Sequence, residues 1–148
     1  MRWHGAPLIT PVSKAGIVSL ELAKTTEQST IIIDQWKKAQ VVEQAISNTY
    51  IDFGFILFYA LFLYAFCFYI STKQQPWAAS ISRTLAVAAL TAGLCDVIEN
   101  YFMLQLLEGT ITSTYAFLSW LFASIKFVLL MLTILWSLGN LHVLFRKK

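Results

Sequence analysis

Three stretches of the chain are apolar over a length that suits helices crossing a membrane. Residues 50–70 and 115–138 are almost entirely apolar, and residues 84–107 are apolar except for a polar cluster near their middle. About 20 apolar residues in an α-helix cover the roughly 30 Å hydrocarbon core of a bilayer. We therefore predict an all-α integral membrane protein, a helical bundle with transmembrane helices over these three ranges.

Residues 1–49 are more polar and predict an amphipathic helix that does not cross the bilayer. Charged side chains recur through residues 21–43 and leave no apolar window of spanning length. Apolar side chains fall on three- and four-residue steps, as in a helix with one buried stripe, at Ile32, Trp36, Ala39, Val42, Ile46 and Tyr50. This fourth helix of the bundle can run straight into residues 50–70 or bend and lie on the membrane surface. The pattern leaves both open.

Basic residues near the ends of the apolar stretches predict the orientation in the membrane, because cytoplasmic loops carry an excess of Lys and Arg. The link 71–83 and the tail 139–148 are basic, whereas the link 108–114 contains neither Lys nor Arg. We predict that the C-terminus is cytoplasmic, although residues 1–49 carry five basic residues of their own. Pro76 suits the first turn of a helix, where its missing N–H costs nothing.

The polar cluster of the middle span consists of Asp96, Glu99 and Asn100. Their spacing of three and four residues places them on about one face of a helix. A charged side chain near the centre of a spanning helix costs roughly 2.5–3.5 kcal/mol on insertion scales, so these groups must face one another or water. Asp52, at the start of the first span, either joins this network or caps the entry to the membrane.

The last span carries a polar stripe of its own, in which Ser119, Lys126 and Thr133 recur every seven residues. Lys126 and Asp96 both lie near the centres of their predicted spans, so an ion pair between them is geometrically available. Two carboxylates on the middle span face one ammonium on the last.

Composition supports a membrane protein and argues against several other classes. The chain of 148 residues has room for one domain, is 57% hydrophobic with a mean hydropathy of +0.64, and is only 13% charged, against about 25% charged residues in soluble domains. Its net charge of +3 lacks the basic stripe expected of a nucleic-acid-binding protein. Cys67 and Cys95 fall at different depths and suit packing better than a disulfide.

The sequence gives little support for an enzyme. The two histidines, His4 and His142, lie near the termini and outside every predicted span. No Cys/His spacing typical of a metal site, no phosphate-binding loop and no Ser/His/Asp arrangement appears. We predict no cofactor, no metal and no catalytic residue.

Four short stretches resemble segments of a group of small bacterial multi-span inner-membrane proteins: GIVSLELA at 16–23, YIDF at 50–53, DVIEN at 96–100 and IKF at 125–127. The resemblance implies an N-terminal arm that packs back on the bundle, with its helix partly outside the bilayer. It also implies that six residues belong to one polar constellation: Glu21, Asp52, Asp96, Glu99, Asn100 and Lys126. It implies no substrate.

These observations predict a multi-pass protein of the bacterial inner membrane whose buried Asp/Glu/Asn/Lys network binds or moves a proton, an ion or a polar lipid group. Ionisable residues within a membrane are by default candidates for such a site. Two alternatives stay open. The network can simply hold the helices in register, or the chain can be a non-catalytic accessory subunit of a larger membrane complex. The expected partners are the lipid bilayer and either a membrane subunit or further copies of this chain.

Overall fold

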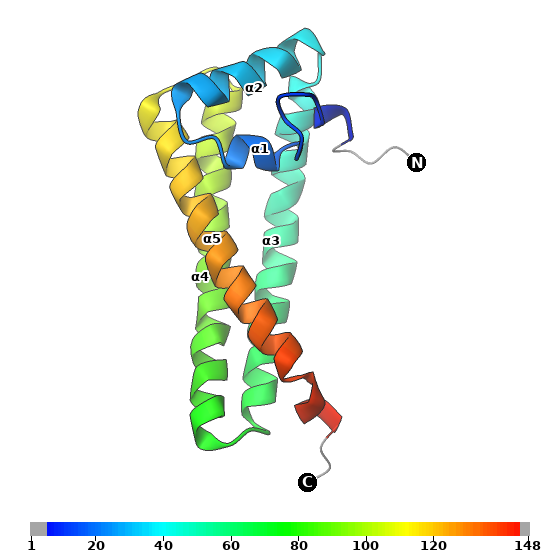
Figure 1. Ribbon diagram of the computed structural model, residues 1–148, viewed down its shortest axis with the longest axis vertical. Coiled ribbons are helices and arrows are strands. Elements are labelled where there is room, and N and C mark those ends of the chain that lie inside the picture. The colour runs from blue at the N-terminus through cyan, green and yellow to red at the C-terminus, as the bar shows by residue number, and fades with distance from the viewer. Residues whose placement is uncertain (1–5, 146–148) are drawn as a thin grey trace. The chain divides into compact units, whose positions relative to one another are not determined.

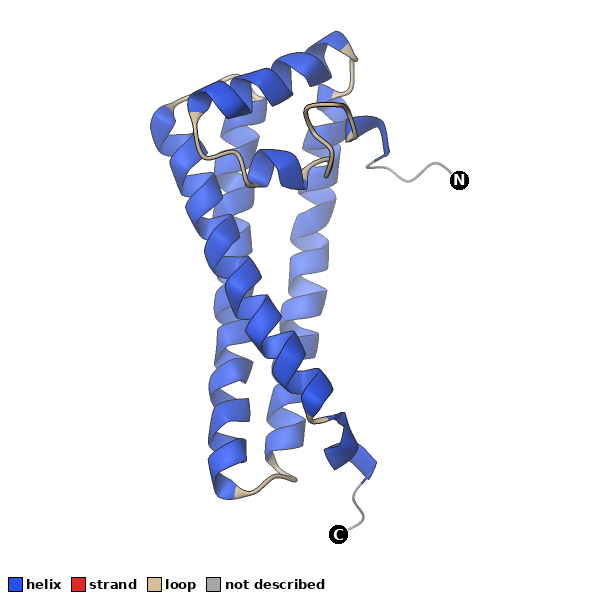
Figure 2. Cartoon of the chain, viewed as in Figure 1, coloured by secondary structure: helices blue, strands red, loops and turns tan. Residues whose placement is uncertain are grey.

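The computed structural model describes residues 6–145, and this part of the chain is helical with no strand (Figures 1 and 2). The predicted all-α fold class is confirmed. His4 lies outside the described residues. The basic residues at 146–148, on which the orientation prediction partly depends, also lie outside them. The described helices are η1 (Ala6–Leu8), α1 (Val18–Glu21), α2 (Thr26–Lys38), α3 (Val42–Ser71), α4 (Pro76–Leu107), α5 (Ser113–Gly139) and η2 (Leu141–Phe145).

Three helices in residues 6–145 are long and apolar enough to cross a membrane, and they are the three that the sequence predicts: α3, α4 and α5. All three begin earlier than predicted, α5 by only two residues, because polar residues precede the apolar run without ending the helix. α3 begins at Val42 and α4 at Pro76. Pro76 occupies the first helical position, where a proline loses no hydrogen bond.

The chain bends sharply between α2 and α3. Gln40 adopts a left-handed φ of 56°, and the N–H of Val41 donates to the carbonyl of Trp36 at 3.0 Å. This pattern is a Schellman motif, and the buried Val41 and Trp36 side chains supply its hydrophobic contact. Of the two alternatives for the amphipathic helix, the bend is therefore correct and the continuous helix is wrong.

The bend also explains why the predicted buried stripe holds for only part of its length. Ile32 and Trp36 on α2 are buried as predicted. Ala39, at the end of α2, and Tyr50, on α3, are exposed instead of buried, whereas Val42 and Ile46 are partly buried against the core. The turn shifts the helical phase, so the buried face of α3 centres on Ala45 and Thr49 and leaves Tyr50 outside it.

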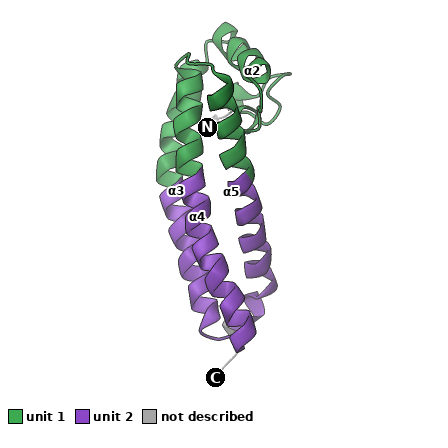
Figure 3. Ribbon diagram, turned by 90° about the vertical axis from the view of Figure 1, so that its left-hand side faces the viewer, with its two compact units in different colours: residues 1–55, 96–124 green, residues 56–95, 125–148 purple. Residues whose placement is uncertain are grey.

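Each of the three long helices contributes one part to each of two compact units (Figure 3). Unit 1 consists of residues 1–55 and 96–124, and unit 2 consists of residues 56–95 and 125–148.

In unit 1, the N-terminal segment packs against the ends of the long helices, and α2 lies across them (Figure 1). The core joins buried side chains of every long helix in the unit to those of α1 and α2. It contains Leu8, Leu20, Ala23, Ile32, Ile33, Trp36, Val41, Ala45, Met103, Leu106, Leu107 and Ala116. The residues before α2 therefore form a packed arm.

A buried tryptophan fastens this arm. The indole Nε1 of Trp36 donates to the carbonyl of Leu8 at 3.0 Å and to the Ser13 hydroxyl at 3.1 Å, while that hydroxyl donates to the same carbonyl at 2.6 Å. On the opposite flank, the Lys24 ammonium lies 4.3 Å from the centroid of the Trp120 ring, a cation–π contact. The arm is thus held by polar contacts as well as by packing.

In unit 2, small residues bring the helices close together. A Cβ atom placed on Gly93 of α4 would lie 2.9 Å from the Cβ of Ala60 on α3. Ala86, Ala89 and Ala92 of α4 are also buried. Small residues at helix contacts are typical of membrane bundles, in which close backbone approach replaces the hydrophobic driving force.

Large apolar side chains lie on the outside of the long helices. Phe58 is 75% exposed, Phe62 65%, and Leu94 and Leu135 are each 61% exposed. Soluble proteins rarely expose large contiguous apolar patches. Buried small residues and exposed large apolar residues together are compatible with an integral membrane protein.

Candidate functional site

The polar cluster of α4 faces the interior of unit 1. Asp96 is 4% exposed, Glu99 0% and Asn100 1%. These positions share a face because their spacing is that of one helical turn. The surrounding turns of α4 supply buried apolar neighbours, Met103 among them.

Asp52 on α3 is joined directly to this cluster. The side-chain nitrogen Nδ2 of Asn100 donates a hydrogen bond to Oδ2 of Asp52 at 2.8 Å. Since the amide nitrogen is used in this way, the amide oxygen Oδ1 of Asn100 points elsewhere, and it has no hydrogen-bond partner among the described residues. Asn100 therefore keeps a buried acceptor available.

A small cavity of about 40 Å³ lies beside this hydrogen bond, entirely within unit 1. Its walls come from the arm, α3 and α4, and are formed by Ile17, Glu21, Asn48, Thr49, Asp52, Asn100 and Met103. Two carboxylates, two amides and a hydroxyl thus line one small space that is partly open. No Lys or Arg is among these lining residues.

The structure places Glu21 at the cavity through the arm. Glu21 is the last residue of the short helix α1 and is only 7% exposed. Leu20, its neighbour, is fully buried in the core of unit 1 and fixes α1 against the bundle. A residue outside every predicted span therefore contributes a carboxylate to the same cavity as Asp52.

Sequence reasoning missed Asn48 and Thr49. Both precede Asp52 on α3, at spacings of four and three residues, and so lie on the same helix face. This spacing is the signal that the sequence offers, but the prediction places residues 1–49 in a polar segment separate from the first span. The Thr49 hydroxyl donates to the carbonyl of Ala45 at 3.0 Å, and its side chain is 1% exposed.

The remaining predicted site residues do not line this cavity. Asp96 and Glu99 are buried on α4 in unit 1 but are not among the lining residues. Lys126 belongs to unit 2, where it is 4% exposed and its ammonium lies 5.0 Å from the centroid of the Phe127 ring. The ion pair between Lys126 and Asp96 stays a prediction.

The polar stripe of α5 faces inward along its length. Ser119 and Thr133 are fully buried, and Ser137 is 6% exposed. In unit 2 the Ser137 hydroxyl lies 3.4 Å from the thiol sulfur of Cys67. The seven-residue repeat therefore marks the buried face of the helix.

The described residues contain no group of three His, Cys, Asp or Glu side chains placed to hold a metal ion. Cys67 and Cys95 are both buried, and no disulfide joins them.

Comparisons with protein-family models, with curated proteins and with solved structures found no match. The resemblance to small bacterial multi-span proteins therefore stays a prediction, and the argument for function rests on the site itself.

Proposed function

We propose that this chain is a multi-pass membrane protein whose unit 1 cavity binds a small cation between the carboxylates of Glu21 and Asp52. The cation is either a proton carried by water or a monovalent metal ion. The observation that carries the proposal is the cavity itself: a small, partly open space lined by two carboxylates from different parts of the chain.

The size of the cavity distinguishes among the three ligands that the sequence predicts: a proton, an ion or a polar lipid group. About 40 Å³ admits water molecules or a small ion. It is far below the roughly 300–1,000 Å³ of sites that hold small organic molecules. A polar lipid head group therefore does not fit, which favours the proton or ion among the three predicted ligands.

The chemistry of the lining atoms points to the same class of ligand. Carboxylate and amide oxygens are ligands preferred by hard cations. The buried Oδ1 of Asn100 adds an acceptor that has no hydrogen-bond partner within residues 6–145. The hydrogen bond from Asn100 to Asp52 holds the second carboxylate in place.

Thermal unfolding of the full chain in detergent tests this proposal. The unfolding temperature is measured against NaCl, with choline chloride keeping the ionic strength constant, and separately against pH without sodium. A ligand that binds only the folded state stabilises it by RT ln(1 + [L]/Kd), about 2.7 kcal/mol at 100 times Kd. We expect the unfolding temperature to rise either with increasing sodium concentration or with decreasing pH.

Two variants and one control identify the site. Asp52→Asn keeps an oxygen that accepts from Asn100 but removes the charge, and Glu21→Gln removes the other charge; both should abolish the dependence. Glu108→Gln changes an exposed carboxylate at the end of α4 and should retain it. Wild-type stability that is independent of both sodium and pH would refute the proposal and favour a role in helix register.

Location and assembly form part of the proposal. We infer a bacterial inner membrane with the C-terminus in the cytoplasm, supported by Lys73 and Arg83 near the α3–α4 turn. A reporter fused to the C-terminus that is active only in the cytoplasm tests the orientation. The accessory-subunit alternative predicts that a partner chain is recovered with the protein in mild detergent.

A further inference from the structure

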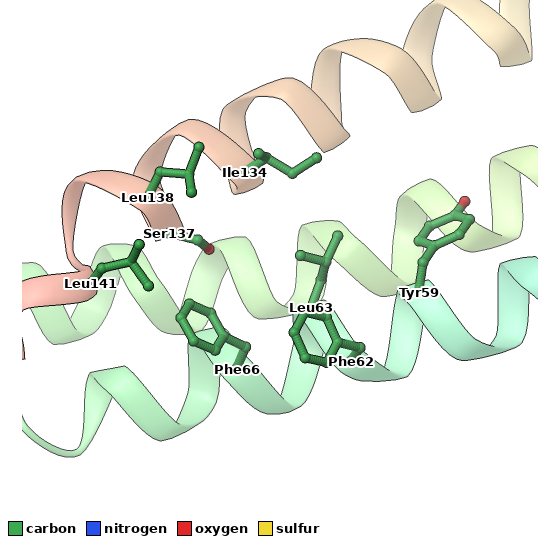
Figure 4. Close-up of a pocket in the computed structure, with 8 residues that line it drawn as sticks. All are labelled: Tyr59, Phe62, Leu63, Phe66, Ile134, Ser137, Leu138 and Leu141. Atoms are coloured by element: carbon green, nitrogen blue, oxygen red, sulfur yellow. The ribbon is translucent and has the colours of Figure 1, made fainter. Parts of the chain in front are cut away.

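A second and much larger cavity lies in unit 2, between α3 and α5. It encloses about 400 Å³, a volume within the usual range of ligand sites. Figure 4 shows the side chains of the two helices facing each other across it. It is lined by Tyr59, Phe62, Leu63 and Phe66 of α3, by Ile134, Ser137 and Leu138 of α5, and by Leu141 of η2.

The walls of this groove suit a hydrocarbon chain. Seven of its eight lining residues are aromatic or aliphatic, and the hydroxyl of the eighth, Ser137, lies 3.4 Å from the Cys67 thiol. The groove is open at its rim, where Phe62 and Leu138 are more than half exposed. In a helix pair that spans a membrane, such a groove opens directly onto lipid.

The positively charged Lys73 lies beyond one end of the groove. The lining residues of α3 follow the three- and four-residue steps of one face, and Tyr69 follows Phe66 by one such step near the end of the helix at Ser71. The Lys73 ammonium lies 4.8 Å from the centroid of the Tyr69 ring. This places an ammonium and an aromatic ring, both common at the membrane interface, beyond the apolar groove.

We infer that this groove holds one acyl chain of a phospholipid with a negatively charged head group, and that Lys73 binds the head group. Transfer of an acyl chain from bulk lipid to the groove gains little hydrophobic energy, because both environments are apolar. Selection must therefore come from the fit of the chain and from the charge at Lys73. Basic residues beside a membrane attract anionic lipids in this way.

Native mass spectrometry of the full chain tests the inference. The protein is equilibrated with mixed micelles that contain equal amounts of phosphatidylglycerol and phosphatidylcholine with identical acyl chains. We expect one phosphatidylglycerol to be retained, at a several-fold excess over phosphatidylcholine. Equal retention of the two lipids would show ordinary boundary lipid and overturn the inference.

Two matched pairs of variants separate the two parts of the site. Leu138→Trp fills the groove, and Leu135→Trp adds the same bulk to α5 at a similarly exposed position outside the lining. Only the first should lower the retention of lipid. Lys73→Gln should reduce the preference for phosphatidylglycerol to about equality, while Arg83→Gln, at an exposed position of α4, should preserve it.

The remaining outcomes also decide the question. If Leu135→Trp lowers retention as much as Leu138→Trp, the lipid does not sit in the groove and the inference fails. If the protein emerges as a dimer without lipid, and Leu138→Trp makes it monomeric, a second copy covers the groove instead. Neither outcome depends on the cation site of unit 1, so the two proposals fail independently.

Discussion

Substitution of Gly93 by alanine tests whether close contact between α3 and α4 stabilises unit 2. The added methyl carbon would lie 2.9 Å from the Cβ of Ala60, whereas nonbonded carbon atoms rest about 3.5–4.0 Å apart. Both atoms are fixed to helix backbones, so the two helices must separate by roughly 0.6–1.1 Å to relieve the clash. Overpacking of this kind costs about 1–3 kcal/mol.

The intrinsic preference of a helix for alanine works in the opposite direction and must be measured separately. Alanine is favoured over glycine by about 1 kcal/mol in an exposed helix. Gly54 of α3 has nothing within 4 Å of the position of an added Cβ, so Gly54→Ala reports this preference alone. The difference between the two variants isolates the cost of the clash.

Unfolding in mixed micelles with increasing amounts of a denaturing detergent, followed by circular dichroism, gives the free energies. We expect Gly93→Ala to be less stable than Gly54→Ala by at least about 1 kcal/mol. The double variant Gly93→Ala with Ala60→Gly moves the methyl group from one helix to the other and should recover most of the loss. The reasoning is refuted if Gly93→Ala unfolds at the same detergent fraction as Gly54→Ala.

Two further predictions concern the arm and the bend in unit 1. Gln40→Gly should raise the free energy of unfolding by about 1 kcal/mol, because glycine adopts the left-handed φ of 56° without the steric cost borne by other residues; the same unfolding titration measures it. Trp36→Phe should cost about 1–2 kcal/mol, because it removes the indole donor to Leu8 and Ser13. Faster proteolysis within residues 6–25 would show that the arm has loosened.

Each of these predictions has a control at a contrasting position. Gln44 is exposed within the first turn of α3, so Gln44→Gly should destabilise the protein where Gln40→Gly stabilises it. Trp77 is 68% exposed, so Trp77→Phe should leave the rate of proteolysis unchanged. If Gln40→Gly is neutral, strain at the bend is not significant, and if Trp36→Phe is cut at the wild-type rate, the indole does not fasten the arm.

The parts of the fold that depend on apolar run length could be predicted from the sequence, because spanning a membrane requires long apolar helices. The three long helices follow from this requirement, and the start of α4 at Pro76 follows from the preference of proline for the first turn of a helix. The bend after α2 could not be predicted, because the left-handed position holds Gln40 where a glycine is the usual signal. Without that signal, the sequence predicts an apolar stripe that continues past residue 39 on one face.

The candidate site, like the fold, could be predicted from the sequence only in part. Helical spacing was sufficient to place Asp96, Glu99 and Asn100 on one buried face of α4. It could not place Glu21, because the position of that carboxylate depends on how the arm folds back over more than twenty residues of intervening chain. Contacts between distant parts of the sequence are set by tertiary packing, and in unit 1 the core around Leu20 and Trp36 determines them.

Because Glu21 belongs to the arm, the presence of its carboxylate at the cavity depends on the packing of the arm. Asp52 and Asn100 are held by α3 and α4, but Glu21 stays at the cavity only while the arm is packed. Loosening the arm through Trp36→Phe should therefore withdraw one carboxylate and leave the Asp52–Asn100 hydrogen bond intact. If a cation binds between both carboxylates, Trp36→Phe must weaken stabilisation by the cation in the same direction as Glu21→Gln. If the polar residues only hold the helices in register, Trp36→Phe lowers stability by the same amount whatever the cation concentration.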